Sequence, residues 1–196
     1  NSALSWEFTT TTNLGLDFGL LGNRISGSLD VYRQETEDIL QRVALPSTSG
    51  VSGVVKNVGE TENKGIELAL TSINIEAEDN GFGWETDLNL FANRNKVTYL
   101  AGGVQSDVNN GWHVGHPIDA IFDYEKIGLV QTGETYLPGF TEGEIKVKDQ
   151  LTVDSEGDGT PDEADGVINA ADRVVLGSTQ PKWSGGLTNR FSYKGI

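Results

Sequence analysis

The chain has 196 residues, a formal net charge of −15 and no cysteine. The lack of cysteine excludes disulfide scaffolds and thiol chemistry, and the acidity argues against nucleic acid as a partner, because it repels phosphate backbones. No apolar run approaches the ~20 residues of a membrane helix. The sequence also contains no methionine and no leader-like segment, which favours an internal piece of a longer protein.

Alternation of apolar and polar residues predicts β-strands, because successive side chains of a strand point to opposite faces. Five segments with this period follow one another along the chain. They lie near residues 5–19, 24–33, 64–75, 83–93 and 182–193. In the third segment, for example, Ile66, Leu68 and Leu70 alternate with polar or small residues. The sequence therefore predicts an all-β fold.

The connections between these segments alternate in length. Residues 20–23 and the Asp79-Asn80-Gly81 link are short, whereas loops are expected over residues 34–63 and 94–181. Transmembrane β-barrels have short periplasmic turns and long extracellular loops. The strands of a soluble β-sandwich also alternate apolar and polar residues, but its short and long loops do not follow one another in strict alternation. Here they do, and the apolar face carries almost no charge, as lipid contact requires. We predict a section of a large antiparallel transmembrane β-barrel, since five strands are fewer than the roughly eight of the smallest bacterial barrel.

Several stretches carry a family resemblance. NSALSWEFTTTTNLGLDFGLLGNRISGSLDVYRQETEDIL (residues 1–40) and NVGETENKGIELAL (57–70) resemble strand signatures of SusC/RagA-type TonB-dependent outer-membrane transporters. VGHPIDAIFDYEKIGLVQ (114–131) and DRVVLGSTQPKWSGGLTN (172–189) resemble later parts of the same family. The resemblance covers essentially the whole chain in family order.

The resemblance implies the C-terminal part of a barrel of roughly 22 strands, in which this chain supplies about five strands and two extracellular loops. Such transporters import oligosaccharides or peptides through the outer membrane of Gram-negative bacteria. They use energy relayed by TonB to a plug region, which is not expected within residues 1–196, and a SusD-like surface lipoprotein lids the barrel. The resemblance therefore implies transport in contact with a lipid bilayer, and no enzymatic activity.

An alternative of another class is a secreted, calcium-stabilised all-β module that binds carbohydrate or mediates adhesion. Such a module would be water-soluble. It would bury Leu14, Leu68, Leu88 and Leu187 in a common core, whereas the barrel would turn them toward lipid.

The acidic stretch VDSEGDGTPDEADGVINAADR, residues 153–173, resembles a calcium loop. Its spacing places oxygen donors where such a loop needs them, with glycine permitting the sharp bend. These donors are Asp154, Glu156, Asp158, Thr160, Asp162 and Asp165, and a second or shared ion would use Asp165, Asn169 and Asp172. Pro161 and the short Asp165 at the last position depart from the pattern. Two interpretations therefore stay open. The stretch either binds calcium, which stiffens an exposed loop, or it is a solvated acidic loop without an ion.

His113 and His116 form an H-x-x-H pair, but no helix is expected that would align them on a metal. We predict loop histidines in solvent. The sequence contains no G-x-S-x-G, phosphate loop or dinucleotide fingerprint, and no pair of carboxylates stands out at catalytic spacing.

Overall fold

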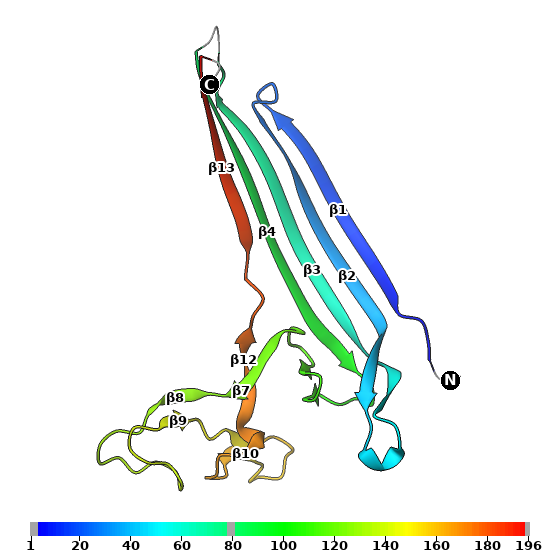
Figure 1. Ribbon diagram of the computed structural model, residues 1–196, viewed down its shortest axis with the longest axis vertical. Helices are drawn as coiled ribbons and strands as arrows, with labels where there is room; N and C mark the ends of the chain where they lie inside the picture. Colours follow the sequence, from blue (N-terminus) through cyan, green and yellow to red (C-terminus); the bar gives the residue numbers. More distant parts are fainter. Residues whose placement is uncertain (1–3, 78–80, 195–196) are drawn as a thin grey trace. The chain divides into compact units, whose positions relative to one another are not determined.

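A computed structural model describes residues 4–77 and 81–194 of the chain. Its main element is a five-stranded antiparallel sheet in the order β1-β2-β3-β4-β13 (Figure 1). The strands are β1 (Phe8–Leu20), β2 (Ile25–Ala44), β3 (Gly53–Ile75), β4 (Phe82–Leu100) and β13 (Ser184–Tyr193). The all-β prediction and its five long strands are confirmed. Among the described residues, no helix is long and apolar enough to cross a membrane.

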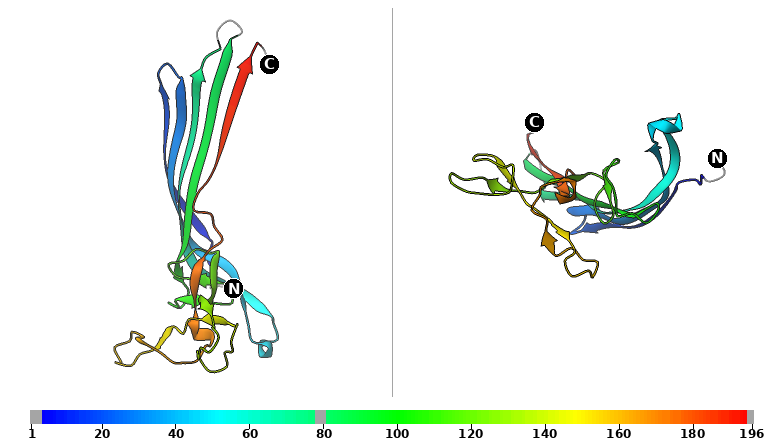
Figure 2. Two further views of the ribbon diagram at one scale, coloured as in Figure 1. Left: turned by 90° about the vertical axis from the view of Figure 1, so that its left-hand side faces the viewer. Right: turned by 90° about the horizontal axis from the view of Figure 1, so that it is seen from below.

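The chain divides into two compact units. The first contains residues 1–118 and 180–196, and it holds the main sheet together with the short pair β5 (Ser106–Asp107) and β6 (Trp112–His113). The second contains residues 119–179. Within the first unit, the five long strands lie side by side in a single layer (Figure 2).

The loop predicted over residues 34–63 is wrong in its bounds. Strand β2 continues to Ala44 and β3 begins at Gly53, and the two stay paired up to their ends. Only residues 45–52 connect them, with a short 3-10 turn, η1 (Ser47–Ser49). The extension of the strands was hidden because residues 34–38 and 60–64 are polar on both faces, so the apolar alternation stops there although the hydrogen-bonded pairing continues beyond them.

The predicted loop over residues 94–181 begins too early, because Arg94, Asn95 and Lys96 are polar on both faces and interrupt the apolar alternation. Strand β4 extends to Leu100 and pairs with β3 as far as Gly59. Short strands occupy much of the remainder, and β13 begins at Ser184, close to the expected residue 182.

The link between β1 and β2 is a tight turn, as predicted. Leu21, Gly22 and Asn23 all have positive φ (54°, 68° and 67°), and the Arg24 amide donates a hydrogen bond to the Leu21 carbonyl at 3.4 Å. Glycine and asparagine adopt this backbone at low cost. In the predicted link between β3 and β4, Asp79 and Asn80 lie outside the described residues.

A bulge interrupts the β2–β3 pairing at Asp38, whose φ is 57°. The Asn57 side chain spans it: its Nδ2 donates to the carbonyl oxygens of Asp38 at 2.6 Å and of Ser5 at 3.1 Å. Its Oδ1 accepts from the Ser5 amide at 3.0 Å. Asn57 therefore ties the segment before β1 to the end of the sheet near the β2–β3 turn.

The second unit, residues 119–179, is built from three two-stranded pairs. These are β7 (Ala120–Tyr124) with β12 (Arg173–Ser178), β8 (Lys126–Leu129) with β9 (Ile145–Val147), and β10 (Leu151–Val153) with β11 (Glu163–Ala164). Tyr136 packs edge-on against Phe140, with ring centroids 5.4 Å apart, and the Lys146 ammonium lies 5.9 Å from the Tyr136 ring. This part of the expected loop is therefore a folded unit with its own packing.

Candidate functional site

One face of the main sheet is aliphatic. Directly paired residues of antiparallel strands share a face, so the register defines rows that cross the sheet. One row contains Leu16, Leu29, Leu68 and Leu90, and the next contains Leu14, Val31, Ile66 and Ala92. Leu14 is 75% exposed and Leu187 is 65% exposed. Within residues 4–77 and 81–194, no second layer covers this face.

The common core expected for a soluble module is not formed within the described chain. The buried apolar residues there are Val58, Val97, Leu100 and Val130. None of them belongs to the rows of leucine and isoleucine on the aliphatic face. Monomeric soluble proteins rarely leave a continuous apolar surface of this kind open to water.

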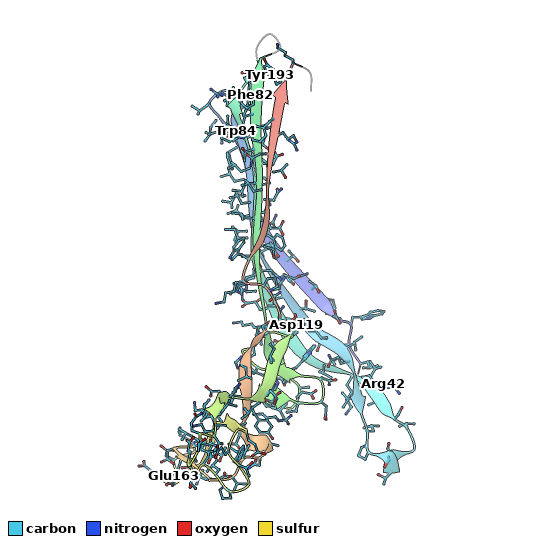
Figure 3. All side chains as sticks on the ribbon, turned by 60° about the vertical axis from the view of Figure 1, so that its left-hand side comes forward. Arg42, Phe82, Trp84, Asp119, Glu163 and Tyr193 are labelled. Carbon is cyan, nitrogen blue, oxygen red and sulfur yellow. The ribbon has the colours of Figure 1, made fainter. Side chains whose placement is uncertain are left out.

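Aromatic residues gather on the same face at the end where β4 begins (Figure 3). The Phe191 ring stacks on Phe82 and Trp84, with centroids 6.1 and 5.9 Å apart, and Tyr193 is paired with Phe82. Aromatic girdles of this kind mark the membrane–water boundary of transmembrane barrels.

Asn189 breaks the alternation of β13 because it places an amide on the aliphatic face. The structure provides partners for it: Trp84 Nε1 donates to Asn189 Oδ1 at 2.9 Å, and Thr86 Oγ1 lies 2.7 Å from the same oxygen. Because the amide oxygen is hydrogen-bonded, its cost on an apolar surface is reduced.

The opposite face of the sheet is polar and charged. Arg190 forms ion pairs with Glu85 and Asp87, each at 2.6 Å, and Thr71 Oγ1 donates to Asp87 at 2.7 Å. The Tyr32 ring crosses over Gly65, where a Cβ would collide with it, and comes within hydrogen-bond distance of Asn93 at 3.1 Å. This face can bind a polar solute through hydrogen bonds and charges.

The acidic loop lies in the second unit, where its carboxylates accept hydrogen bonds from the loop itself. Asp154 accepts from the amides of Gly157, Asp158 and Gly159 at 2.6–3.1 Å. Asp158 in turn accepts from the Thr160 amide at 2.8 Å. These bonds shape the turn.

Two other predicted calcium ligands of the loop, Asp162 and Asp165, also accept hydrogen bonds from within it. Asp162 accepts two bonds from Ser155, both at 2.9 Å, and these bonds lower the pKa of its carboxyl. Asp165 accepts from the Val167 amide at 2.8 Å and from Asn169 Nδ2 at 3.3 Å, while Glu156 is exposed. Among the described residues, the structure brings together no group of three or more His, Cys, Asp or Glu side chains suited to a metal ion. Calcium binding stays a prediction.

Asp172 is the one member of this set that is fully buried. It closes a capping box on η2 (Ala170–Asp172), where it accepts from the Asn169 amide at 2.7 Å. It also accepts from the Gln150 amide at 2.9 Å and so links η2 to the segment that enters β10. The structure thus assigns Asp172 to holding the second unit together.

Replacing Asp172 by alanine is expected to destabilise the second unit by roughly 1–3 kcal/mol, because two backbone amides then lose their buried acceptor. Amide hydrogen exchange on the full-length protein should show lost protection around Gln150 and Asn169. Glu156→Ala, an exposed change in the same loop, is the matched control. Unchanged protection in the Asp172 variant would contradict this role.

The prediction for the histidines is wrong for His113. Its side chain is 3% exposed, with Nδ1 3.0 Å from Ser106 Oγ, and burial lowers the pKa of its imidazole. The pairing of β5 with β6 covers it, which the sequence did not indicate because each strand has two residues. His116 is exposed, as expected.

The sequence analysis did not predict a cluster of ion pairs around Glu62. This carboxylate is 7% exposed and forms ion pairs with Arg33 at 2.8 Å, Lys64 at 3.0 Å and Lys96 at 3.3 Å. Its members come from three strands, so only the register reveals it. The sequence contained one indication of it: Arg33 lies two positions from Val31, and Lys64 lies two positions from Ile66, so both cations share the face of these apolar residues.

Comparisons with known proteins agree with this geometry. The family model for "TonB dependent receptor-like, beta-barrel" matches residues 1–193. TonB-dependent receptor P3 of Formosa agariphila is 33% identical over 99% of this chain and 20% of its own length. TonB-dependent receptor SusC of Bacteroides thetaiotaomicron is 32% identical over 99% of this chain and 19% of its own length.

Solved structures show the same likeness. A chain in the structure of the RagAB peptide transporter superimposes with a TM-score of 0.72 and 27% identity, covering 100% of this chain and 20% of that chain. The structure of the RagAB peptide importer in its closed-closed state gives a TM-score of 0.72 and 26% identity, again over 100% of this chain and 20% of that chain. This chain therefore spans about one fifth of the length of the relatives that it matches.

Proposed function

The chain belongs to the TonB-dependent receptor β-barrel family, in its SusC/RagA type, and from this premise we propose that it forms part of the wall of a nutrient importer in the outer membrane of a Gram-negative bacterium. The observation that carries the proposal is the aliphatic face, which crosses the sheet in register and has no protein cover within the described residues. Lipid is the neighbour that such a face requires. The wall section itself performs no catalysis.

The orientation follows from the lengths of the connections. The tight turn over residues 20–23 would face the periplasm, whereas residues 45–52 and the second unit, residues 119–179, would be extracellular. The second unit is inserted between β4 and β13, so it would lie where substrate arrives.

The proposed cargo is an oligosaccharide or a peptide. The peptide option follows from the likeness to the RagAB peptide transporter, at 27% identity. The oligosaccharide option follows from the resemblance to SusC/RagA-type transporters, of which SusC is 32% identical to this chain. We propose that a SusD-like surface lipoprotein meets the extracellular parts, and that TonB supplies energy through a plug region elsewhere in the protein. The charged inner face, with Arg190 between Glu85 and Asp87, suits a water-filled or plug-filled lumen.

The test is cell fractionation combined with uptake by cells that produce the full-length protein. We expect the protein in the outer-membrane fraction, soluble only with detergent, and uptake of labelled oligosaccharide or peptide that is lost when TonB is deleted. Deletion of the partner lipoprotein should lower uptake at limiting substrate. Recovery as a water-soluble protein in the medium would support the secreted module instead.

Calcium binding by residues 154–172 is a separate proposal that rests on donor spacing alone. Asp154 and Asp158 accept amides, and a carboxylate has about four lone-pair sites, so both could bind an ion through the sites that the amides leave free. Calorimetric titration of the full-length protein with calcium decides it, with Asp158→Ala as the matched variant. Heat that is equal in both proteins would remove calcium from this loop.

A further inference from the structure

A band of cations lies on the aliphatic face, at the end of the sheet nearer the β2–β3 turn. The register pairs Arg33 of β2 with Lys64 of β3, and Lys64 with Arg94 of β4. Each stands two positions beyond Val31, Ile66 or Ala92, and residues two apart on a strand share a face. We call Arg33, Lys64, Arg94 and the neighbouring Lys96 the basic row.

The basic row keeps excess positive charge in a strongly acidic protein. Glu62 and Glu35 are the carboxylates within it, and Glu62 is shared by three of the cations. The four cations and two carboxylates leave a net charge of +2, against −15 for the chain. Arg94 donates to the carbonyl oxygens of Asn93, Pro181 and Lys182, at 2.6–3.3 Å, rather than to a carboxylate.

The cations remain accessible. The side chains of Arg33, Lys64 and Lys96 are 53%, 55% and 48% exposed. A hollow of about 580 Å³ opens beside them, and its exposed lining is mostly apolar. It includes Leu14, Val31 and Ile66 on the aliphatic side and Arg33, Lys64 and Arg94 on the charged side.

The position of the basic row matches the far edge of a bilayer. From Trp84 in the aromatic cluster to Arg94, β4 advances about 33 Å at ~3.3 Å per residue. With a strand tilt of ~40°, this corresponds to ~25 Å along the barrel axis, the height of the apolar band of such barrels. Aromatic rings therefore mark one boundary of the hydrocarbon and cations mark the other.

We propose that the basic row and its hollow bind the phosphate groups of anionic lipid in the extracellular leaflet, with an acyl chain lying along the aliphatic side. Arginine offers paired N–H donors that fit phosphate oxygens, and lysine adds mobile charge on a flexible stem. A free carboxylate would be a poorer occupant, because the exposed lining of the hollow is mostly apolar. This inference rests on the proposed function, because it needs the aliphatic face to meet lipid.

The experiment uses the full-length receptor purified from outer membranes in a mild detergent. Native mass spectrometry measures its binding of phosphorylated lipid A, of dephosphorylated lipid A and of inorganic phosphate. We expect binding of the phosphorylated lipid alone, weakened about a hundredfold or more in the double variant Lys64→Gln, Arg94→Gln, because two charge-assisted bonds to phosphate are lost. Arg190→Gln, which removes a cation from the opposite face of the same sheet, should bind as the parent does.

Glu62→Gln separates lipid binding from a purely structural role. This change frees three cations and should strengthen binding of the phosphorylated lipid several-fold, whereas a structural role predicts lost stability and unchanged binding. Equal binding of phosphorylated and dephosphorylated lipid would overturn the proposal, as would inorganic phosphate that competes at similar concentration. A receptor that fractionates to the outer membrane but ignores lipid phosphate would refute this inference and leave the proposed function intact.

Discussion

Leu68→Arg is expected to cost roughly 2–4 kcal/mol of stability in the membrane, because it places a guanidinium on the lipid face near the bilayer midplane. Leu68 lies in β3 at the centre of the sheet, paired with Leu29 on one side and Leu90 on the other. An arginine there is far from either boundary, so snorkelling cannot bring its charge to water. Urea unfolding of the full-length protein in lipid vesicles measures the loss, and the amount recovered in outer membranes reports assembly.

Glu67→Arg is the matched control, because it changes the adjacent residue on the opposite face. Glu67 is exposed and already charged, and Asp30 is its partner in β2, so an arginine gains an opposite charge nearby. We expect stability close to that of the parent. If the two variants lose stability equally, the aliphatic face does not meet lipid.

The strands that carry an apolar face were predictable, and their polar extensions were not. Around Ile66 to Leu70 the alternation reports both the strand and its faces, because one face avoids water. Residues 61–64 of β3 still pair with residues 33–36 of β2 without interruption, but they are polar on both sides. Backbone hydrogen bonds form regardless of side-chain polarity, so the sequence lost its signal where the proposed membrane ends.

The bulge at Asp38 adds a second reason. The extra residue on β2 between Thr36 and Ile39 and a compensating irregularity between Ile39 and Leu40 interrupt the alternation, although Leu40 again pairs with Asn57 in the earlier register. The positive φ of Asp38, 57° in the structure, and the shifts in pairing between Thr36 and Leu40 reveal the bulge. Short-range sequence patterns contain no such information.

The candidate site residues also divide into those that local sequence patterns could indicate and those that depend on contacts distant in the sequence. The spacing in the acidic loop predicted oxygen donors suited to calcium, which stays a prediction, and in the structure these carboxylates accept backbone amides, as carboxylates that can surround a cation also can. It did not indicate that Asp172 is buried, because its partner Gln150 comes from outside the motif. The basic row was missed because it depends on the register between strands, which is a long-range property.

Gly27→Val is expected to cost about 3 kcal/mol, the upper part of the usual range for overpacking, although valine favours strands. Gly27 lies in β2 where the backbone of β3 approaches closely: an added Cβ would collide with the carbonyl oxygen of Ala69 and lie 3.2 Å from Leu70 Cα. The Phe18 ring closes the third side, with Cζ at 2.9 Å. Backbone atoms of a paired strand cannot move aside without breaking the ladder, so β2 and β3 must separate.

Gly186→Val in β13 controls for the loss of glycine itself, because no atom lies within 4 Å of a Cβ built there. This variant should be as stable as the parent or slightly more so, by up to ~1 kcal/mol, since valine restricts the unfolded chain and suits a strand. The same urea unfolding in vesicles compares the two. If the Gly27 variant is as stable as the Gly186 variant, β2 and β3 can separate freely at this point. The register that defines both faces of the sheet would then be wrong there.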